Sequence, residues 1–234
     1  RRSSDLATAT DRVLDLAGEA PIEVGLIARP GMPIEPVREG VIACIGTPVL
    51  VSGVEVGARS AWRTLDDLGV TITVEIPREG FDAALDEVAA AAHDYALAGG
   101  PDIQAKFRTG ATDVWAWPDE AELARFIHGC VARRLPFKLT GGLHHVIRAD
   151  RVDGPQHGLL NVLTAVDAAA AGAMPDQIAS CLAERSTTPL ADVLRGMTGE
   201  EIAEVRAVFR AYGCCTVTDP IGELVELGLL KEEH

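Results

Sequence analysis

Short strand-like segments alternate with amphipathic helical segments along most of this chain. Val70–Ile76 has the β-branched content of a strand, and Phe81–Leu97 is an Ala-rich helical segment closed by two glycines. A second strand, Ile103–Gly110, follows. Repeated β-then-α units are typical of a parallel sheet. At 234 residues the chain is long enough to bury one core of this kind.

The expected number of strands predicts the class of fold. Ile22–Ala28 and Pro136–Thr140 add two strands, Cys214–Thr218 is the expected last strand, and Val41–Ile45 is a further apolar run. The total of about six or seven strands falls short of the eight in a (β/α) barrel. We therefore expect an α/β fold with a distorted or incomplete (β/α) barrel, in a single domain of residues 1–234. A doubly wound open parallel sheet is the alternative.

The remaining segments are expected to be helices and one loop. Asp5–Leu16 and Val56–Leu68 have helical spacing of their apolar residues. Pro118 opens a helix with acidic residues in its first turn, and a capping box at Thr198 opens another that runs to Tyr212. Ala149–Gln156 is predicted to be a polar loop.

Polar and charged side chains share one face of three expected strands. Side chains two residues apart point the same way, so Lys106 faces with Arg108, and Lys138 faces with Thr140. Glu75 lies on the polar face of its own strand. Internal strands of a parallel sheet are usually apolar on both faces, and unpaired buried charges are costly. This face is therefore predicted to line a ligand-filled pocket; a structural network that pairs Glu75 with the cations is the alternative.

The cations of this face indicate a site for a small anionic substrate. Repulsion between neighbouring cations favours the neutral amine, which is the nucleophile of Schiff-base chemistry. We expect Lys138 to form an imine or to act as a base, and Lys106 and Arg108 to hold a carboxylate or phosphate. Thr140 and the backbone of Gly141 are expected to contact the same substrate. In the alternative, Lys138 binds an anion without covalent chemistry.

Three histidines follow the Lys138 strand within fourteen residues. We expect His144 and His145, together with Glu75, to move protons. His157 precedes Asn161 by one helical turn, and both are expected to contact the substrate. A metal site formed by the histidines and Glu75 is an alternative, but no H-x-H or H-x-x-x-H spacing supports it, so neither a metal nor a cofactor is expected.

Charge and cysteine content limit the partners of the chain. The formal net charge of −14 opposes binding to nucleic acid and to anionic membranes. No apolar run has the length of a membrane span, and no signal-peptide core follows the first residues. Five cysteines without C-x-x-C spacing indicate a reduced, cytoplasmic protein without a disulfide framework. The sequence leaves open whether the chain forms a homo-oligomer.

In combination, four segments resemble those of an uncharacterised bacterial α/β family with a barrel-like fold. Its members carry Ala-Lys-x-Arg-Thr-Gly, Pro-Phe-Lys-x-Thr-x-Gly-Leu-His-His, His-Gly-x-x-Asn and a Gly-x-Cys strand before an acidic-Pro step. The matching segments here are Ala105–Gly110, Pro136–His145, His157–Asn161 and Gly213–Pro220. This chain departs from the family at Ala111, where glycine is usual, and at Cys214–Thr216, where Ser-Cys-Ser is usual. The resemblance supports the choice of these positions and implies no particular activity.

The run from Lys138 to Gly141 is also similar to the lysine strand of deoxyribose-phosphate-type class I aldolases. That similarity implies an imine at Lys138. We expect a cofactor-independent lyase or isomerase that acts on a small carboxylated or phosphorylated carbonyl compound. The alternatives are a metal-dependent hydrolase or isomerase that uses His144, His145 and Glu75, and a non-catalytic protein that binds a small anion.

Overall fold

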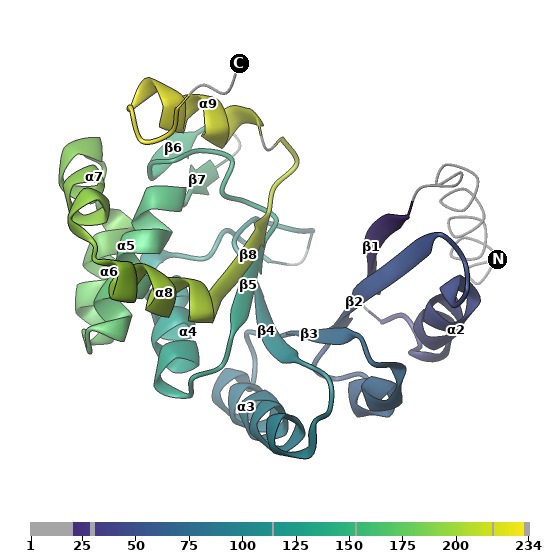
Figure 1. Cartoon of the computed structure of the whole chain (residues 1–234). Coiled ribbons are helices and arrows are strands. Elements are labelled where there is room, and N and C mark those ends of the chain that lie inside the picture. The colour runs from purple at the N-terminus through teal and green to yellow at the C-terminus, as the bar shows by residue number, and fades with distance from the viewer. Residues whose placement is uncertain (1–20, 29–30, 114, 153, 217, 232–234) are drawn as a thin grey trace. The chain divides into compact units, whose positions relative to one another are not determined.

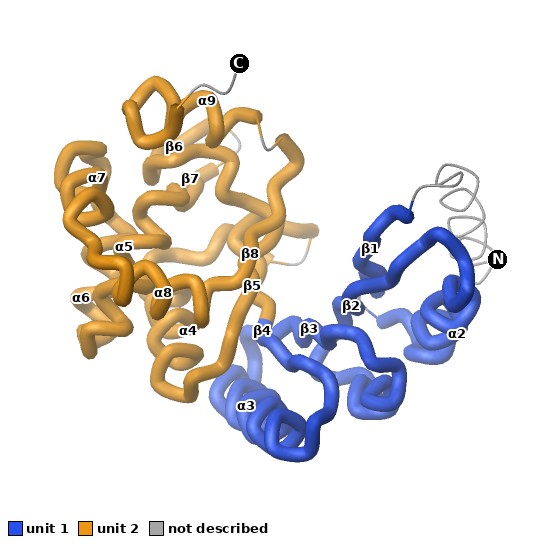
Figure 2. The backbone as a smooth tube through the Cα atoms, viewed as in Figure 1, with its two compact units in different colours: residues 1–105 blue, residues 106–234 orange. Residues whose placement is uncertain are grey.

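The computed structural model describes residues 21–28, 31–113, 115–152, 154–216 and 218–231. The predicted helix Asp5–Leu16 lies outside these residues. The chain divides into two compact units, unit 1 with residues 1–105 and unit 2 with residues 106–234 (Figure 2). The expectation of a single domain stays a prediction.

The strands of the main sheet follow one another in chain order, β1-β2-β3-β4-β5-β8. The pairs whose register is described, β1 with β2, β2 with β3 and β5 with β8, are parallel. A doubly wound sheet reverses its order at a switch point, whereas a (β/α) barrel keeps chain order. In the described part of the chain, β1 and β8 are the two ends of this order. The predicted α/β fold with an incomplete (β/α) barrel is therefore confirmed.

Unit 1 contains three strands, two helices, a 3-10 segment and the start of β4 among its described residues. They are β1 (Ile22–Ile27), α2 (Glu35–Cys44), β2 (Val49–Gly57), η1 (Trp62–Leu68), β3 (Thr71–Glu75), α3 (Phe81–Ala98) and β4 (Ile103–Arg108). The predicted helix Val56–Leu68 is wrong, because its first residues end β2 and only η1 is helical. The reason is burial: the valines of β2 fill the core of unit 1, with Val54 and Val56 nearly inaccessible. The apolar run Val41–Ile45 belongs to α2 as far as Cys44.

Unit 2 holds the end of β4 and the remaining elements (Figure 1). They are α4 (Glu120–Ala132), β5 (Phe137–Thr140), β6 (Ala149–Arg151), β7 (Gly154–Gln156), α5 (Leu159–Ala170), α6 (Pro175–Ala183), α7 (Thr187–Gly196), α8 (Gly199–Val208), β8 (Phe209–Gly213) and α9 (Thr218–Glu226). Helices α4 to α8 gather on one side of β5 and β8 (Figure 1).

Two predictions in unit 2 are wrong. The expected loop Ala149–Gln156 is an antiparallel pair, β6 with β7, whose polar residues gave no strand pattern. The last strand is β8, which ends at Gly213, so the expected strand Cys214–Thr218 lies too far along the chain. The capping box at Thr198 is confirmed by its bonds with Glu201, but the helix ends at Val208 because the next residue, Phe209, enters the sheet.

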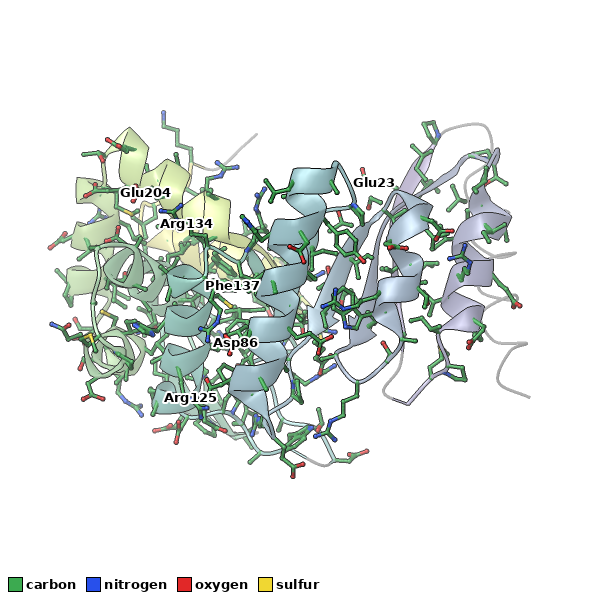
Figure 3. The ribbon with its side chains drawn as sticks, turned by 90° about the horizontal axis from the view of Figure 1, so that it is seen from below. Glu23, Asp86, Arg125, Arg134, Phe137 and Glu204 are labelled. Carbon is green, nitrogen blue, oxygen red and sulfur yellow. The ribbon has the colours of Figure 1, made fainter. Side chains whose placement is uncertain are left out.

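A row of four phenylalanines forms the centre of unit 2. Phe107 of β4 stacks on Phe126 of α4, with ring centroids 4.8 Å apart. Phe126 meets Phe137 of β5 edge to face at 5.2 Å, and Phe137 stacks on Phe209 of β8 at 5.4 Å. Phe137 lies inside the unit, whereas Arg134 stands at the surface (Figure 3). The row therefore assigns one face of β4, β5 and β8 to the core.

We predict that Phe126→Ala lowers the free energy of unfolding by about 3–5 kcal/mol, because it empties the middle of this row. Ile202→Ala, on the exposed side of α8, is the control and should cost at most about 0.5 kcal/mol. Urea denaturation measures both variants. Equal stabilities would contradict a core centred on Phe126.

Candidate functional site

The face of β4 and β5 that points away from the phenylalanine row carries the predicted cations. Phe107 and Phe137 face α4, so by alternation Lys106 and Lys138 lie on the opposite face. The two strands are neighbours, because the Thr109 N–H donates to the Thr140 carbonyl at 2.8 Å. Lys106 is buried and Lys138 is half-buried. The structure thus brings both lysines to one side of adjacent strands.

At the carboxyl ends of these strands, glycines allow two backbone segments to approach closely. A Cβ on Gly110 would stand 1.6 Å from the carbonyl oxygen of Gly141, and a Cβ on Gly142 would stand 2.6 Å from Thr109 Oγ1. Real side chains cannot occupy such positions. The β4 and β5 edges are therefore held together by residues that have no side chain.

Arg108 lies against Gly141 at this edge. The position of a Cβ on Gly141 is 3.1 Å from Arg108 Nη1 and 3.3 Å from its Cγ, and the φ of Gly141 is +77°. The Gly141 N–H donates to the carbonyl of Gly213 at 3.1 Å, so β8 ends at the same place. The Arg108 side chain thus occupies the space beside the half-buried Gly141 backbone, where a side chain on residue 141 would crowd it.

Thr140 brings a hydroxyl to the same edge. Its Oγ1 atom is buried and has no hydrogen-bonding partner in the part of the chain that the structure describes. In the register with β8, Thr140 stands opposite Gly213, and Lys138 stands opposite Ala211. A buried hydroxyl without a partner costs free energy, which a ligand oxygen or a water recovers. Arg108, Thr140 and Gly141, three of the predicted substrate-binding residues, are thus brought together.

His145 is paired with a carboxylate that the sequence did not point to. Its Nδ1 lies 2.6 Å from Oε1 of Glu223, and the Val146 N–H donates to Oε2 of the same residue at 2.7 Å. Glu223 belongs to α9, 78 residues along the chain from His145. No spacing rule connects them, because only the docking of α9 makes the pair. His144, the other predicted proton carrier, is half-buried.

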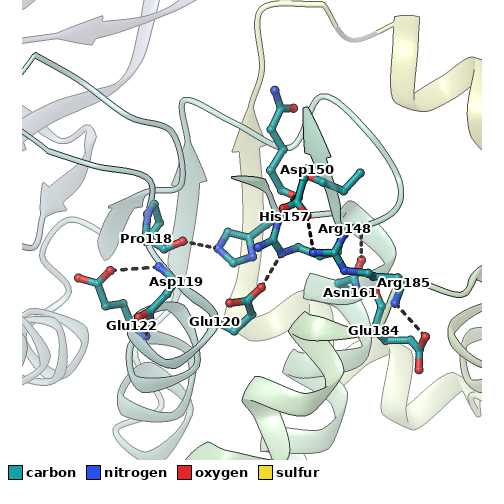
Figure 4. A network of polar contacts seen from close by, with 12 residues as sticks. Pro118, Asp119, Glu120, Glu122, Arg148, Asp150, His157, Asn161, Glu184 and Arg185 are labelled. Atoms are coloured by element: carbon teal, nitrogen blue, oxygen red, sulfur yellow. Dashed lines mark hydrogen bonds and ion pairs between the residues drawn. The ribbon is translucent and has the colours of Figure 1, made fainter. Parts of the chain in front are cut away.

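His157 and Asn161 belong to a buried polar network instead of the lysine face (Figure 4). His157 is 1% exposed, and its Nε2 donates to the Pro118 carbonyl at 2.9 Å. Asn161 accepts from the Arg148 N–H at 2.8 Å and donates to the carbonyls of Cys181 and Glu184. Its polar atoms are thus engaged within the chain, so the structure gives Asn161 a role in joining β6, α5 and α6.

Arg148 is the centre of this network, and no sequence pattern predicted it. Its side chain is 7% exposed, and Nε donates to Oε1 of Glu120 at 2.5 Å. Burial is the largest single effect and opposes the ionised form of Glu120. The hydrogen bonds from Arg148 and from the backbone, together with the nearby charges of Arg148 and His157, outweigh it, so the pKa of Glu120 is lowered. A buried arginine needs such a partner, because an unpaired charge in the core is costly. The network joins the start of α4 to the β6–β7 pair.

Glu75, the remaining predicted site residue, ends β3 in unit 1, where it is half-buried. Its neighbourhood is polar: on β3, Thr73 accepts a hydrogen bond from Gln104 of β4 at 2.8 Å. The other nine predicted site residues belong to unit 2.

Within the described ranges, no group of three or more His, Cys, Asp or Glu side chains could hold a metal ion. No helix in these ranges is long and apolar enough to cross a membrane. Comparison of the chain with protein-family models, with curated proteins and with solved structures gave no match. The resemblance to a bacterial family therefore stays a prediction.

Unit 2 brings together side chains of the kinds that bind oxyanions and supply an amine. They are two lysines on one strand face, a guanidinium against the half-buried backbone of Gly141, and a buried hydroxyl that has no hydrogen-bonding partner among the described residues. A His–carboxylate pair follows β5 in the chain. Oxyanions bind well to such groups, and amines react with carbonyl carbons.

We predict that Gly110→Ala destabilises the protein by about 3 kcal/mol or more, because the new methyl group collides with backbone that cannot move away. Gly196→Ala is the control, since a Cβ there meets no atom within 4 Å. Thermal and chemical denaturation compare the two. A stable Gly110→Ala variant would contradict the close approach of the β4 and β5 edges.

A second prediction concerns pH. Burial, together with the charge of Arg148, lowers the pKa of His157 below its usual 6.5. The unfolded chain therefore takes up the proton first as pH falls below about 6.5. The free energy of unfolding should decrease in that range by up to about 1.4 kcal/mol per pH unit.

His157→Gln keeps an N–H donor for Pro118 but cannot titrate, so its stability should fall less steeply with pH. Urea denaturation between pH 7.5 and 5.5 measures the slopes, and His93→Gln, at an exposed position of α3, serves as the control for removing a histidine. If the free energy of unfolding falls equally with pH in the wild type and in His157→Gln, then His157 has the same pKa in the folded and unfolded states, and the prediction is wrong.

Proposed function

We propose that the carboxyl edge of β4 and β5 binds a small anionic carbonyl compound, and that the protein is a cofactor-independent lyase or isomerase. The observation that supports this most directly is a grouping at one edge: Arg108, the Gly141 backbone and the buried hydroxyl of Thr140, which has no partner among the residues that the structure describes. Arg108, with Lys106 on the same strand face, would hold the carboxylate or phosphate.

The number and positions of the lysines in this chain support a reaction through a lysine amine. The sequence contains three lysines, Lys106, Lys138 and Lys231, against eighteen arginines. Two of the three stand on the proposed site's strand face, although arginine is the better residue for binding anions through fixed pairs of hydrogen bonds. A primary amine can do what a guanidinium cannot, which is to form an imine.

In the proposed reaction, the neutral amine of Lys138 attacks the substrate carbonyl carbon, and the carbonyl oxygen leaves as water. The protonated imine then withdraws the electron pair of a neighbouring C–H or C–C bond, and the enamine formed is reprotonated on carbon. Hydrolysis by water returns the lysine and releases the product. His144 or His145, each of which follows β5 in unit 2, is proposed to carry the protons.

The proposal also concerns where the protein works. All five cysteines are free thiols, which supports a reducing compartment such as the cytoplasm. The net charge of −14 supports a small-molecule substrate in place of nucleic acid or an anionic membrane.

The test is reductive trapping. Borohydride is added to the protein with each of a panel of small carboxylated and phosphorylated aldehydes and ketones, and the intact mass is measured. We expect one adduct of the reduced imine, located at Lys138 by peptide mapping and absent from Lys138→Met.

Lys231→Met, near the chain end, is the matched control and should keep the adduct. Because the chain has three lysines, every modified amine can be assigned. An adduct that survives Lys138→Met, or no adduct with any compound of the panel, would overturn the imine mechanism.

A further inference from the structure

We infer that Glu223 of α9 is a positioning residue that makes Nε2 of His145 the basic nitrogen of the proposed site. The inference rests on the proposed function for its chemistry. Glu223 lies outside every segment that the sequence analysis selected. Its role follows from which atoms of Glu223 and His145 can donate or accept a hydrogen bond.

The hydrogen bonds determine the tautomer of the ring. An ionised carboxylate only accepts, and Glu223 already accepts from the Val146 N–H at 2.7 Å through Oε2. The 2.6 Å contact of Oε1 with His145 Nδ1 therefore requires a hydrogen on Nδ1. In the neutral ring Nε2 then carries the lone pair, which is the form of histidine that accepts a proton from a substrate.

The position of the pair fits a role at the proposed site. His145 comes five residues after Thr140, the last residue of β5, and α9 begins five residues after Gly213, the last residue of β8. Thr140 and Gly213 are partners in the parallel register. Both members of the pair therefore follow the carboxyl ends of adjacent strands, where the ligands of α/β proteins bind.

The segment of His145 and the helix of Glu223 have supports besides this pair. The His145 carbonyl accepts from the Leu159 N–H at 3.0 Å, and the Val146 carbonyl accepts from Leu160 at 2.9 Å, so the segment is already tied to α5. Helix α9 has its own apolar contact through Leu224, which packs on the cluster of Val146, Leu160 and Leu190. The side chains of His145 and Glu223 are 24% and 31% exposed, and ion pairs with such exposure add little stability.

In the proposed reaction, His145 takes the proton from the carbon next to the Lys138 imine, while the C–H electron pair enters the enamine. The proton moves to Nε2, and the Glu223 carboxylate balances the charge that the ring gains. The same nitrogen returns the proton to carbon. Glu223 itself stays ionised throughout and serves to orient the ring.

Nuclear magnetic resonance of histidine-labelled protein tests the positioning without any substrate. Long-range ¹H–¹⁵N correlations show which ring nitrogen carries the hydrogen, and His145→Gln identifies the signals. We expect His145 to carry its hydrogen on Nδ1 in the wild type, and a population with the hydrogen on Nε2 in Glu223→Ala. Glu226→Ala, at an exposed position of the same helix, is the control and should keep the wild-type pattern.

Proton transfer is measured with a carbonyl compound that borohydride traps. Loss of its α-hydrogen to D₂O should slow by at least about tenfold in Glu223→Ala, within the ~10²–10⁴-fold that a general base contributes, while trapping at Lys138 persists. If no compound is trapped, the proposed function fails. The inference about Glu223 is then tested by the tautomer of His145 alone, which nuclear magnetic resonance measures without a substrate. A wild-type ring with its hydrogen on Nε2, or a tautomer unchanged in Glu223→Ala, would overturn the inference whatever Lys138 does.

Discussion

The packing of Phe126 between Phe107 and Phe137 is the contact on which the arrangement of unit 2 depends. In a strand, successive side chains point to opposite faces. The rings of Phe107 and Phe137 determine which of the two faces packs against α4. Once they are buried, Lys106 and Lys138 must lie on the other face, because their positions differ by one residue from those of the rings. The burial of the aromatic core therefore also determines which face of the strands carries the two lysines.

Glycines at the carboxyl edge of this face let β4 and β5 approach closely. A Cβ on Gly110 would lie 1.6 Å from the Gly141 oxygen, so residue 110 can carry no side chain. That closeness places Arg108 against bare backbone and leaves the Thr140 hydroxyl buried without a partner in the described part of the chain. Under the proposed function, an edge that is already ordered by folding would lose little conformational entropy when a small ligand binds.

Unit 2 contains two polar clusters with different properties. In the network of Arg148, contacts with Glu120 and Asn161 join segments that are distant in the chain, which is the behaviour of a structural cluster. The pair of His145 and Glu223 engages Nδ1 of the histidine ring with a carboxylate of another helix. The two clusters also differ in burial, because the side chain of Arg148 is 7% exposed and that of His145 is 24% exposed.

The sequence alone determined the alternation of strands and helices, the strands of Lys106 and Lys138 and the shared face of their cations, because these follow from local periodicity. It misplaced β8, because Phe209 continues a helical pattern but packs on Phe137 in the sheet. It missed the β6–β7 pair, because these short polar strands have no apolar alternation. Only the tertiary structure paired His145 with Glu223, across 78 residues. Local rules extend over one helical turn or one strand, so contacts between distant segments are decided by packing.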